Sequence, residues 1–541
     1  MAGTRASLRK DTRQNTRAPA SGRPPFGRIL IANRGEIAVR IARACRELGI
    51  ESVAVHSDAD SDAVHVRAAD RSIRIGPAAA AESYLRVEAI VEAARQSGAQ
   101  AVHPGYGFLS EQPALADACE AAGIVFIGPG RDTLARLGDK LGARARAEEA
   151  GVPVVPGTFE PIHVGPAGGE QELVAVAERI GYPVLVKAAA GGGGRGMRRV
   201  DEAHHLGEAV TSAAREAAAA FGDGSVYLEL YVEHARHVEV QLLGDARGSI
   251  VALGERDCST QRRHQKLVEE APAPGLTAEE RRRLFDLAIK VARTVGLRNA
   301  ATAEFLFTRE GDFWFLEVNA RLQVEHGVTE LVADVDLVAE QIWLAAGLPL
   351  SERVLAASEQ MVEPRRHAIE VRLSAEDPAA DFAPSPGLIT AWRTPSGPGV
   401  RVDSGVEQGS VVGPDYDPLL AKLMVVAGDR RGALARLRRA LDECEIAGLQ
   451  TTLPFHRWLI SQPGFTGGDG LSTDFVARHW QPSELVSVAA LRASELAARA
   501  AVGGVLSPTP AYASVTGRAD HEAAGSPWWQ AGILEAMDRG A

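Results

Sequence analysis

Short apolar runs alternate with amphipathic stretches from residue 28 to residue 127. Apolar runs of strand length occupy positions 28–32, 52–55, 101–103 and 124–127. Residues 35–48, between the first two runs, predict a helix that carries apolar Ile37, Ile41 and Ala42. Strands that alternate with helices in this way are typical of a parallel, doubly wound sheet, so we predict an α/β first domain.

The pattern changes after residue 150. Strands are predicted at 184–187, 197–200 and 226–230, with a helix around 171–180. From 232 onward, short alternating strands such as 237–243 and 303–307 predict a mixed α+β region. We therefore expect a disordered basic arm, a first domain, a linker with a glycine-rich segment, a large core with a further domain, and a tail of unknown role, at 1–25, 26–139, 140–231, 232–480 and 481–541.

Composition restricts the classes of partner and compartment. The chain has a formal charge of −11, yet positions 1–28 hold seven basic residues and one acid, so the remainder is at −17. That acidic body disfavours nucleic-acid binding, and no run of about 20 apolar residues predicts a membrane span. Four widely spaced cysteines indicate a reducing compartment. We expect a cytoplasmic protein, or a mitochondrial matrix protein if the arm is a presequence.

Lysine is rare in this chain. Only six of the 59 basic residues are lysine, at positions 10, 140, 187, 266, 290 and 422. Arginine is a planar fork and lysine a compact point charge, so the few lysines that remain are candidates for sites that need such a charge.

Gly191, Gly193 and Gly196 match the spacing GxGxxG. The dinucleotide fingerprint must open a helix, whereas these glycines lead into the predicted strand at 197–200. A strand, a glycine run and a second strand predict a hairpin whose backbone N–H groups can close over phosphates.

Polar and apolar residues alternate strictly between positions 317 and 325. If the segment stays extended, Glu317, Asn319, Arg321, Gln323 and Glu325 share one face. Glu304, on the preceding predicted strand, would lie beside Glu317 if the two strands pair. Two carboxylates and an amide oxygen are hard ligands that suit Mg²⁺.

Several long segments resemble one known family. Strand 184–187 and the glycine run resemble the nucleotide lid of ATP-grasp enzymes, and residues 27–460 as a whole are similar to biotin carboxylase. The segments that carry the resemblance are IANRGEIAVRIARACRELGI from Ile31, HPGYGFLSE from His103, ERDCSTQRRHQK from Glu255 and EVNARLQVEH from Glu317. The resemblance implies a doubly wound N-terminal domain, an ATP-grasp lid and central domain, and a C-terminal domain.

The resemblance also implies a role for each matching residue. ATP would contact Lys140 and Lys187 through its phosphates, and also Gly193, Gly194, Glu229, Leu230, Tyr231, Val232, His237 and His264. Mg²⁺ or Mn²⁺ would be held by Glu304, Glu317 and Asn319. Bicarbonate would bind Lys266, Arg321 and the N–H of Val324, with Glu325 as its base. Arg321 would also stabilise negative charge on the enolate-like ureido oxygen of biotin. Arg372 would lie at the end of the site where phosphate and biotin bind.

The implied activity is the first half-reaction of an acyl-CoA carboxylase such as acetyl-CoA carboxylase of fatty acid biosynthesis. Bicarbonate and ATP would give carboxyphosphate, which carboxylates biotin on a separate biotin carboxyl carrier protein. Carboxyltransferase subunits and a second copy of the chain would be partners. No lysine follows Lys422, so the C-terminal region would carry no biotin.

Two alternatives stay open, namely another bicarbonate-using ATP-grasp ligase of the carbamoyl-phosphate synthetase type and a silent scaffold subunit. Three departures from the family pattern are Leu230 in place of a lysine found in some members, Ala190 for glycine and Gly327 for proline. Cys258 and His103 are interpreted as structural, and Lys290 as solvated.

Overall fold

The computed structural model describes residues 24–162, 170–189, 197–468 and 470–485. Almost all of the predicted basic arm and of the tail after 481 lies outside these residues, as do Ala190, Gly193 and Gly194 of the glycine run. None of the described helices combines the length and the apolar character that crossing a membrane requires.

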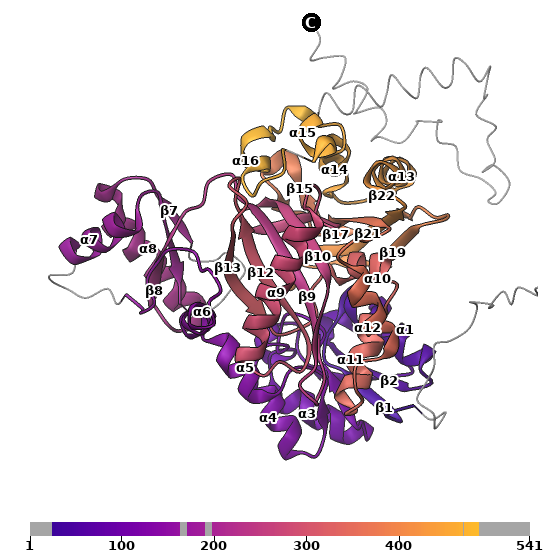
Figure 1. Cartoon of the computed structure of the whole chain (residues 1–541). Helices are drawn as coiled ribbons and strands as arrows, with labels where there is room; N and C mark the ends of the chain where they lie inside the picture. Colours follow the sequence, from indigo (N-terminus) through magenta and orange to yellow (C-terminus); the bar gives the residue numbers. More distant parts are fainter. Residues whose placement is uncertain (1–23, 163–169, 190–196, 469, 486–541) are drawn as a thin grey trace, which may run out of the picture. The chain divides into compact units, whose positions relative to one another are not determined.

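The first region is a five-stranded parallel sheet in the order β3-β2-β1-β4-β5, drawn in indigo and violet in Figure 1. Its strands are β1 (Arg28–Ile31), β2 (Glu51–Ser57), β3 (Arg71–Gly76), β4 (Ala101–His103) and β5 (Val125–Phe126). The helices among them are α1 (Gly35–Glu47), α2 (Val64–Ala68), α3 (Val87–Ser97), α4 (Pro113–Ala121) and α5 (Arg131–Gly138). The parallel α/β region predicted from the sequence is confirmed, because α1 buries Ile37, Ile41 and Cys45 against the sheet.

A small antiparallel sheet follows, in the order β7-β6-β8. It consists of β6 (Val184–Ala188), β7 (Arg198–Val200) and β8 (Val226–Leu230), accompanied by α6 (Lys140–Glu149), α7 (Glu170–Ile180) and α8 (Leu206–Phe221). The apolar side of α8, including Leu206, Val210 and Ala213, packs on β6 and β8. An isolated bridge joins Val154 to Phe315, so this region is tied to the sheet described next, and a second bridge joins Gly157 to Glu229 of β8.

The largest element is an eight-stranded antiparallel sheet, ordered β13-β12-β9-β10-β11-β14-β21-β19. Its strands are β9 (Arg236–Gly244), β10 (Ile250–Arg262), β11 (Gln265–Ala271), β12 (Asn299–Phe307), β13 (Phe313–Asn319), β14 (His367–Ser374), β19 (Val400–Ser404) and β21 (Leu419–Ala427). Unlike the first sheet, it is wholly antiparallel, which agrees with the α+β character predicted for the later part.

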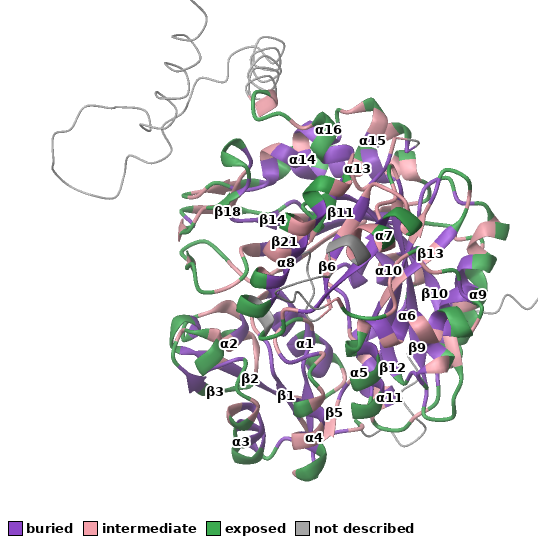
Figure 2. Cartoon of the chain, turned by 90° about the vertical axis from the view of Figure 1, so that its left-hand side faces the viewer, coloured by how far each residue is buried: buried purple, intermediate pink, exposed green. Residues whose placement is uncertain are grey.

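The main hydrophobic core lies between this sheet and helix α9 (Ala278–Thr294). Thr277 and Glu280 form a capping box at the start of α9, because the side chain of each accepts a hydrogen bond from the backbone N–H of the other. Leu284 and Ala288 point from the helix into the core and are fully buried. Burial of such a leucine contributes about 1.5–3 kcal/mol. Figure 2 shows buried residues along the strands and exposed residues on the outer sides of helices such as α3 and α4.

The remaining elements extend the C-terminal part of the described chain. Helices α10 (His326–Ala333), α11 (Leu337–Ala345) and α12 (Glu352–Gln360) follow β13, and the later helices are α13 (Arg430–Glu443), α14 (Leu453–Leu459), α15 (Pro463–Gly467) and α16 (Phe475–His479). Three short strand pairs join β15 (Glu376–Asp377) to β16 (Ala383–Pro384), β17 (Gly387–Leu388) to β20 (Val411–Val412), and β18 (Ala391–Arg393) to β22 (Glu445–Ala447).

The condition under which five polar residues would share one face is not met. The alternating segment 317–325 does not stay extended, because β13 ends at Asn319 and the chain turns before α10 begins at His326. The N–H of His326 donates to the carbonyl of Gln323, which closes this turn. The predicted pairing of the two carboxylates is confirmed, since Glu304 and Glu317 lie directly opposite each other on β12 and β13.

Candidate functional site

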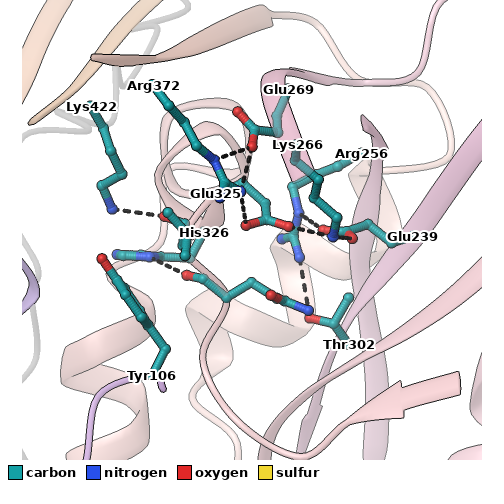
Figure 3. Close-up of polar contacts among 12 residues, drawn as sticks. Tyr106, Glu239, Arg256, Lys266, Glu269, Thr302, Glu325, His326, Arg372 and Lys422 are labelled. Carbon is teal, nitrogen blue, oxygen red and sulfur yellow. Dashed lines mark hydrogen bonds and ion pairs between the residues drawn. The ribbon is translucent and has the colours of Figure 1, made fainter. Parts of the chain in front are cut away.

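Lys266 is the centre of a buried group of carboxylates (Figure 3). It lies on β11, and its Nζ contacts Glu239 and, at 2.7 Å, Glu325, both labelled in Figure 3. The same Nζ lies 3.1 Å from Glu304. Glu239 and Glu304 face each other on β9 and β12, and Glu325 is the N-cap residue of α10. Burial alone would lower the pKa of Lys266, but the three carboxylates raise it well above its usual value. Lys266 is therefore a permanent cation within reach of the proposed base.

Arg256 supports this group from inside the sheet. Its guanidinium is fully buried and donates to Glu239 at 2.6 Å and to Gln241 at 2.9 Å. It also donates to the hydroxyls of Thr302 and Thr329. A buried charge needs such a complete set of partners, because each lost partner leaves an expensive unpaired group. Arg256 thus fixes Glu239 beside Lys266.

Glu325 lies between two cations. Besides Lys266, it accepts from Arg372 of β14 at 3.0 Å, and Arg372 also donates to Glu269 at 2.7 Å (Figure 3). Burial alone would raise the pKa of Glu325, but Lys266, Arg372 and then Arg256 hold it well below its usual value. Glu325 is therefore an ionised carboxylate, completely shielded from water, that can accept a proton from a bound anion.

The predicted metal ligands lie together at the end of the hairpin formed by β12 and β13. The Nδ2 of Asn319 donates to Glu304 Oε1 at 2.8 Å, and Lys140 lies 3.2 Å from Glu317. Lys140 lowers the pKa of Glu317, and for Glu304 the effect of Lys266 and His237 exceeds that of burial and lowers its pKa well below the usual value. Two ionised carboxylates beside an amide are a donor set that fits Mg²⁺ or Mn²⁺.

Two other groupings of possible ligands need a different interpretation. His237, Glu239 and Glu304 come together, as do Glu239, Cys258 and Glu325. In both groups, two carboxylates already contact the ammonium of Lys266. We therefore interpret the centre of both groups as the position of the Lys266 ammonium group. Glu304, Glu317 and Asn319 stay the predicted metal ligands.

The two lysines predicted to contact phosphate come from different elements. Lys140 is the first residue of α6, and Lys187 lies on β6, where its Nζ contacts Glu229 at 2.8 Å. Burial alone would lower the pKa of Lys187, but Glu229 and the neighbouring Tyr227 raise it. Both lysines therefore stay charged and are suited to an anionic ligand between the small sheet and β13.

The predicted ATP-contacting segment, 229–232, spans the end of β8 and the two residues after it. The carboxylate of Glu229 is buried and is bound by Lys187 and Arg144, so it serves to hold these cations. The N–H groups of Leu230 and Tyr231 donate to the carbonyls of Pro156 and Pro183. A base bound here would therefore have to use other backbone groups of the segment, such as the N–H of Val232.

Arg321 and Val324 lie in the turn after β13. Arg321 donates to Gln323 at 2.8 Å and to Asn319 at 3.1 Å, and it lies 3.0 Å from Glu111 of the first region. The carbonyl of Val324 accepts from Lys422 at 2.7 Å. His237 lies 2.9 Å from Glu304, whereas His264 is exposed in the turn between β10 and β11. The turn between β13 and α10 thus carries Arg321 and Val324, two of the three residues predicted to bind bicarbonate.

Sequence reasoning missed several residues of this site, among them Glu111, Glu239, Arg256 and Glu269. Their signals were present, because Glu111 ends the segment HPGYGFLSE and Arg256 lies in ERDCSTQRRHQK. Glu239 lies between His237 and Gln241 at alternate positions of a buried strand, whose intervening positions are the apolar Val238 and Val240. A charged residue inside a buried strand must have a buried partner, and this rule would have identified Glu239, Arg256 and Glu269.

The structural interpretations of Cys258 and His103 agree with their surroundings. Cys258 is fully buried, and burial followed by the charge of Glu239 raises its pKa well above the usual value, so it is no thiolate nucleophile. Burial and then Arg40 lower the pKa of His103 to about 3, and its Nδ1 accepts from the N–H of Gly105. Gly105 has φ +62°, as the predicted turn requires.

Gly327, the departure from proline, has a physical explanation. A Cβ atom at this position would lie 2.3 Å from the sulfur of Met424, which is fully buried on β21. The methionine thus fills the space that a larger residue 327 would need.

We expect Gly327→Ala to lower the free energy of unfolding by about 1–3 kcal/mol, because it overpacks a filled site. Alanine in place of glycine ordinarily stabilises a helix by about 0.5–1 kcal/mol. The sign of the change in the free energy of unfolding therefore distinguishes overpacking from helix propensity. Urea unfolding measures the difference. Gly138→Ala is the matched control, since Gly138 also lies in a helix, α5, and nothing lies within 4 Å of its Cβ position. A stabilising Gly327→Ala would contradict the packing explanation.

Comparisons with known proteins point to one family. Residues 25–134 match the family model of the biotin carboxylase N-terminal domain, residues 139–353 that of the carbamoyl-phosphate synthase L chain ATP-binding domain, and residues 370–478 that of the biotin carboxylase C-terminal domain. The chain is 49% identical over 451 residues to a pyruvate carboxylase subunit of Methanothermobacter thermautotrophicus, covering 83% of this chain and 89% of the relative. It is 48% identical to a biotin carboxylase of Nostoc sp., covering 83% and 98%.

Solved structures agree with this result. A biotin carboxylase complex with β,γ-ATP from Campylobacter jejuni superposes with a TM-score of 0.79 at 44% identity, covering 84% of this chain and 99% of that chain. The biotin carboxylase domain dimer of the 2-oxoglutarate carboxylase of Hydrogenobacter thermophilus, in complex with MgADP, ADP and bicarbonate, has the same TM-score at 42% identity, covering 84% and 98%.

Proposed function

Because this chain belongs to the biotin carboxylase family, we propose that the cluster around Lys266 carboxylates biotin that a separate carrier protein delivers. The chain is an ATP-dependent carboxylase, and therefore a ligase, with ATP, Mg²⁺ and bicarbonate as its reactants and cofactor.

The observation that carries the proposal is a buried, ionised Glu325 held between Lys266 and Arg372. Bicarbonate beside Lys266 would lose its proton to Glu325, and an oxygen of the resulting anion would attack the γ-phosphorus of ATP. The products are carboxyphosphate and ADP. Lys266, Arg321 and the N–H of Val324 would hold the anion, because converging donors are needed to replace its water shell.

The second step transfers the carboxyl group. Carboxyphosphate breaks down to CO₂ and phosphate, the phosphate takes the N1 proton of biotin, and N1 attacks the carbon of CO₂. Negative charge on the ureido oxygen would be stabilised by Arg321, and Arg372 would bind at the phosphate and biotin end. Both guanidiniums are close to the base, since Arg372 contacts Glu325 and Arg321 lies in the same turn.

ATP would lie along Lys140, Lys187 and residues 229–232 at the end of β8. Lys140 and Lys187 would contact its phosphates, together with Gly193 and Gly194, which lie outside the described residues. The base would use backbone groups of 229–232, with His237 and His264 as further contacts. Glu304, Glu317 and Asn319 would hold Mg²⁺ or Mn²⁺, which neutralises phosphate charge when bound.

The carrier and the acceptor follow from the same argument. No lysine follows Lys422, which favours biotin on another polypeptide, a biotin carboxyl carrier protein, over biotin on the C-terminal part of this chain. Carboxyltransferase subunits would complete the reaction, and a homodimer is proposed because a related domain crystallised as a dimer. We propose an acyl-CoA such as acetyl-CoA as the final acceptor; the Methanothermobacter relative makes pyruvate the alternative.

We expect the purified chain to release ADP from ATP in the presence of Mg²⁺ and bicarbonate, and free biotin to stimulate that release severalfold. Biotin stimulation has a physical basis, because biotin captures the CO₂ released from carboxyphosphate and so prevents its loss or return to the reactants, while the phosphate that takes the N1 proton leaves as a product. A coupled spectrophotometric assay measures the rate with and without biotin. Bicarbonate-dependent turnover that biotin leaves unchanged would indicate another ATP-grasp ligase, and no turnover would indicate a scaffold.

A further inference from the structure

Lys422 is a buried cation for which the steps above have no use. Its side chain is completely shielded from water on β21, and its Nζ donates to the carbonyl of Val324 at 2.7 Å. The same Nζ lies 3.2 Å from Glu36 Oε1. Val324 directly precedes the proposed base, Glu325. An ammonium that far from water is costly, so its partners must be well placed.

The partners of Lys422 come from a particular point of the first region. Glu36 lies at the start of α1, directly after β1, and Tyr106 follows β4. The strand order reverses between β1 and β4, which is the crevice where doubly wound sheets commonly hold a ligand. Here the hydroxyl of Tyr106 donates to Glu36, and the ammonium of Lys422 lies 6.0 Å from the ring centre. A side chain of β21 therefore occupies the crevice.

Two neighbouring strands hold the Val324–Glu325 segment from one side. Lys422 and Arg372 are paired positions of β21 and β14. Arg372 binds the carboxylate of Glu325, whereas Lys422 binds the carbonyl of the peptide that joins Val324 to Glu325 (Figure 3). One cation thus fixes the side chain of the base and the other fixes its backbone.

We propose that Lys422 is a positioning residue. It links the crevice of the first sheet to the turn between β13 and α10, where bicarbonate would bind, and so fixes the positions of Val324 and Glu325. This inference rests on the proposed function of that turn. Burial alone would lower the pKa of Lys422, but Glu36, then Glu370 and Asp403, raise it, so the link stays charged. A misplacement of about 1 Å at such a turn can cost about 100-fold in rate.

The test is the kinetics of Lys422→Met, which keeps the length of the side chain but removes its charge and donors. We expect the KM for bicarbonate to rise about tenfold and the biotin-dependent kcat to fall about tenfold, because the turn loses its anchor. The Kd of ATP, measured by calorimetry, should stay within about twofold, since Lys140 and Lys187 are unchanged.

Two further variants separate positioning from general destabilisation. Glu36→Gln keeps the bond from Lys422 to Val324 but removes its charge partner, and it should shift the KM for bicarbonate in the same direction by a smaller factor. Arg281→Met is the matched control, because Arg281 is also a largely buried cation, paired with Glu255 at 2.7 Å. It should lower the melting temperature and leave the KM for bicarbonate unchanged.

The outcomes are distinguishable. Wild-type protein that shows no biotin stimulation would overturn the proposed function itself. If wild-type protein is stimulated while Lys422→Met and Glu36→Gln both keep the wild-type KM for bicarbonate, the positioning role is refuted. If Lys422→Met does not fold, Glu36→Gln alone decides, because an unchanged KM in that variant refutes the link and a raised KM supports it.

Discussion

Glu325→Gln is expected to lower the biotin-dependent rate of ADP release by about 10²–10⁴-fold, because an amide cannot accept the bicarbonate proton. The wild-type carboxylate is ionised at all working pH values, since Lys266 and Arg372 overcome the effect of burial and hold its pKa well below the usual value. Glutamine has nearly the same shape, so the loss reports the proton acceptor and not the volume of the side chain. Initial rates at saturating ATP and bicarbonate measure it.

The binding of ATP separates a catalytic loss from a folding defect. Calorimetric titration of Glu325→Gln with ATP should give the wild-type Kd, because Lys140 and Lys187 contact other carboxylates. Glu359→Gln is the control, since Glu359 is exposed on α12. A Glu325→Gln enzyme with the wild-type rate would show that some other group removes the proton.

Local patterns predicted those parts of the site that one hairpin holds together. The order of two consecutive predicted strands indicated that Glu304 would lie beside Glu317 if those strands paired, and the register confirms this. The same reasoning failed after Asn319. Alternation of polar and apolar residues does not indicate where a strand ends. The strand β13 ends at Asn319, so Arg321 lies in the turn that the hydrogen bond between His326 and Gln323 closes.

The convergence on Lys266 could not be predicted from local pattern. Glu239, Lys266 and Glu304 lie on β9, β11 and β12, and β12 pairs with β9 although β10, β11 and α9 come between them in the sequence. Such pairing depends on the packing of the whole sheet. The resemblance to a family supplied Lys266, Glu304 and Glu325 as site residues, but it supplied neither Glu239 nor the contacts by which the three carboxylates keep Lys266 charged.

The link between Glu36 and Lys422 is still more distant along the chain. A glutamate at the start of a helix is ordinarily explained by the helix dipole, and a lysine in an apolar strand has no local explanation. Only the closeness of the first sheet to β21 makes the two a pair. The scarcity of lysine in the sequence was the one signal that marked this position.

Lys266→Met should have the second large effect, on both activity and stability. Glu239, Glu304 and Glu325 would lose the cation they share, and breaking a buried ion pair typically costs about 3–5 kcal/mol. Bicarbonate would lose its ammonium partner, so turnover should fall at least about 10²-fold. Lys290→Met, at an exposed position of α9, is the matched control and should change neither quantity.

The pH dependence of unfolding tests the electrostatic origin of this loss. Without Lys266, burial and mutual repulsion raise the pKa values of the carboxylates in the folded state above those in the unfolded state. A carboxylate whose folded pKa is raised destabilises the protein above that pKa and ceases to do so as the pH falls through it. The difference in the free energy of unfolding between wild type and Lys266→Met, measured with urea, should therefore decrease as the pH is lowered from 8 to 5. A gap that stays constant over this range would mean that lost packing, and not the three carboxylates, accounts for the destabilisation.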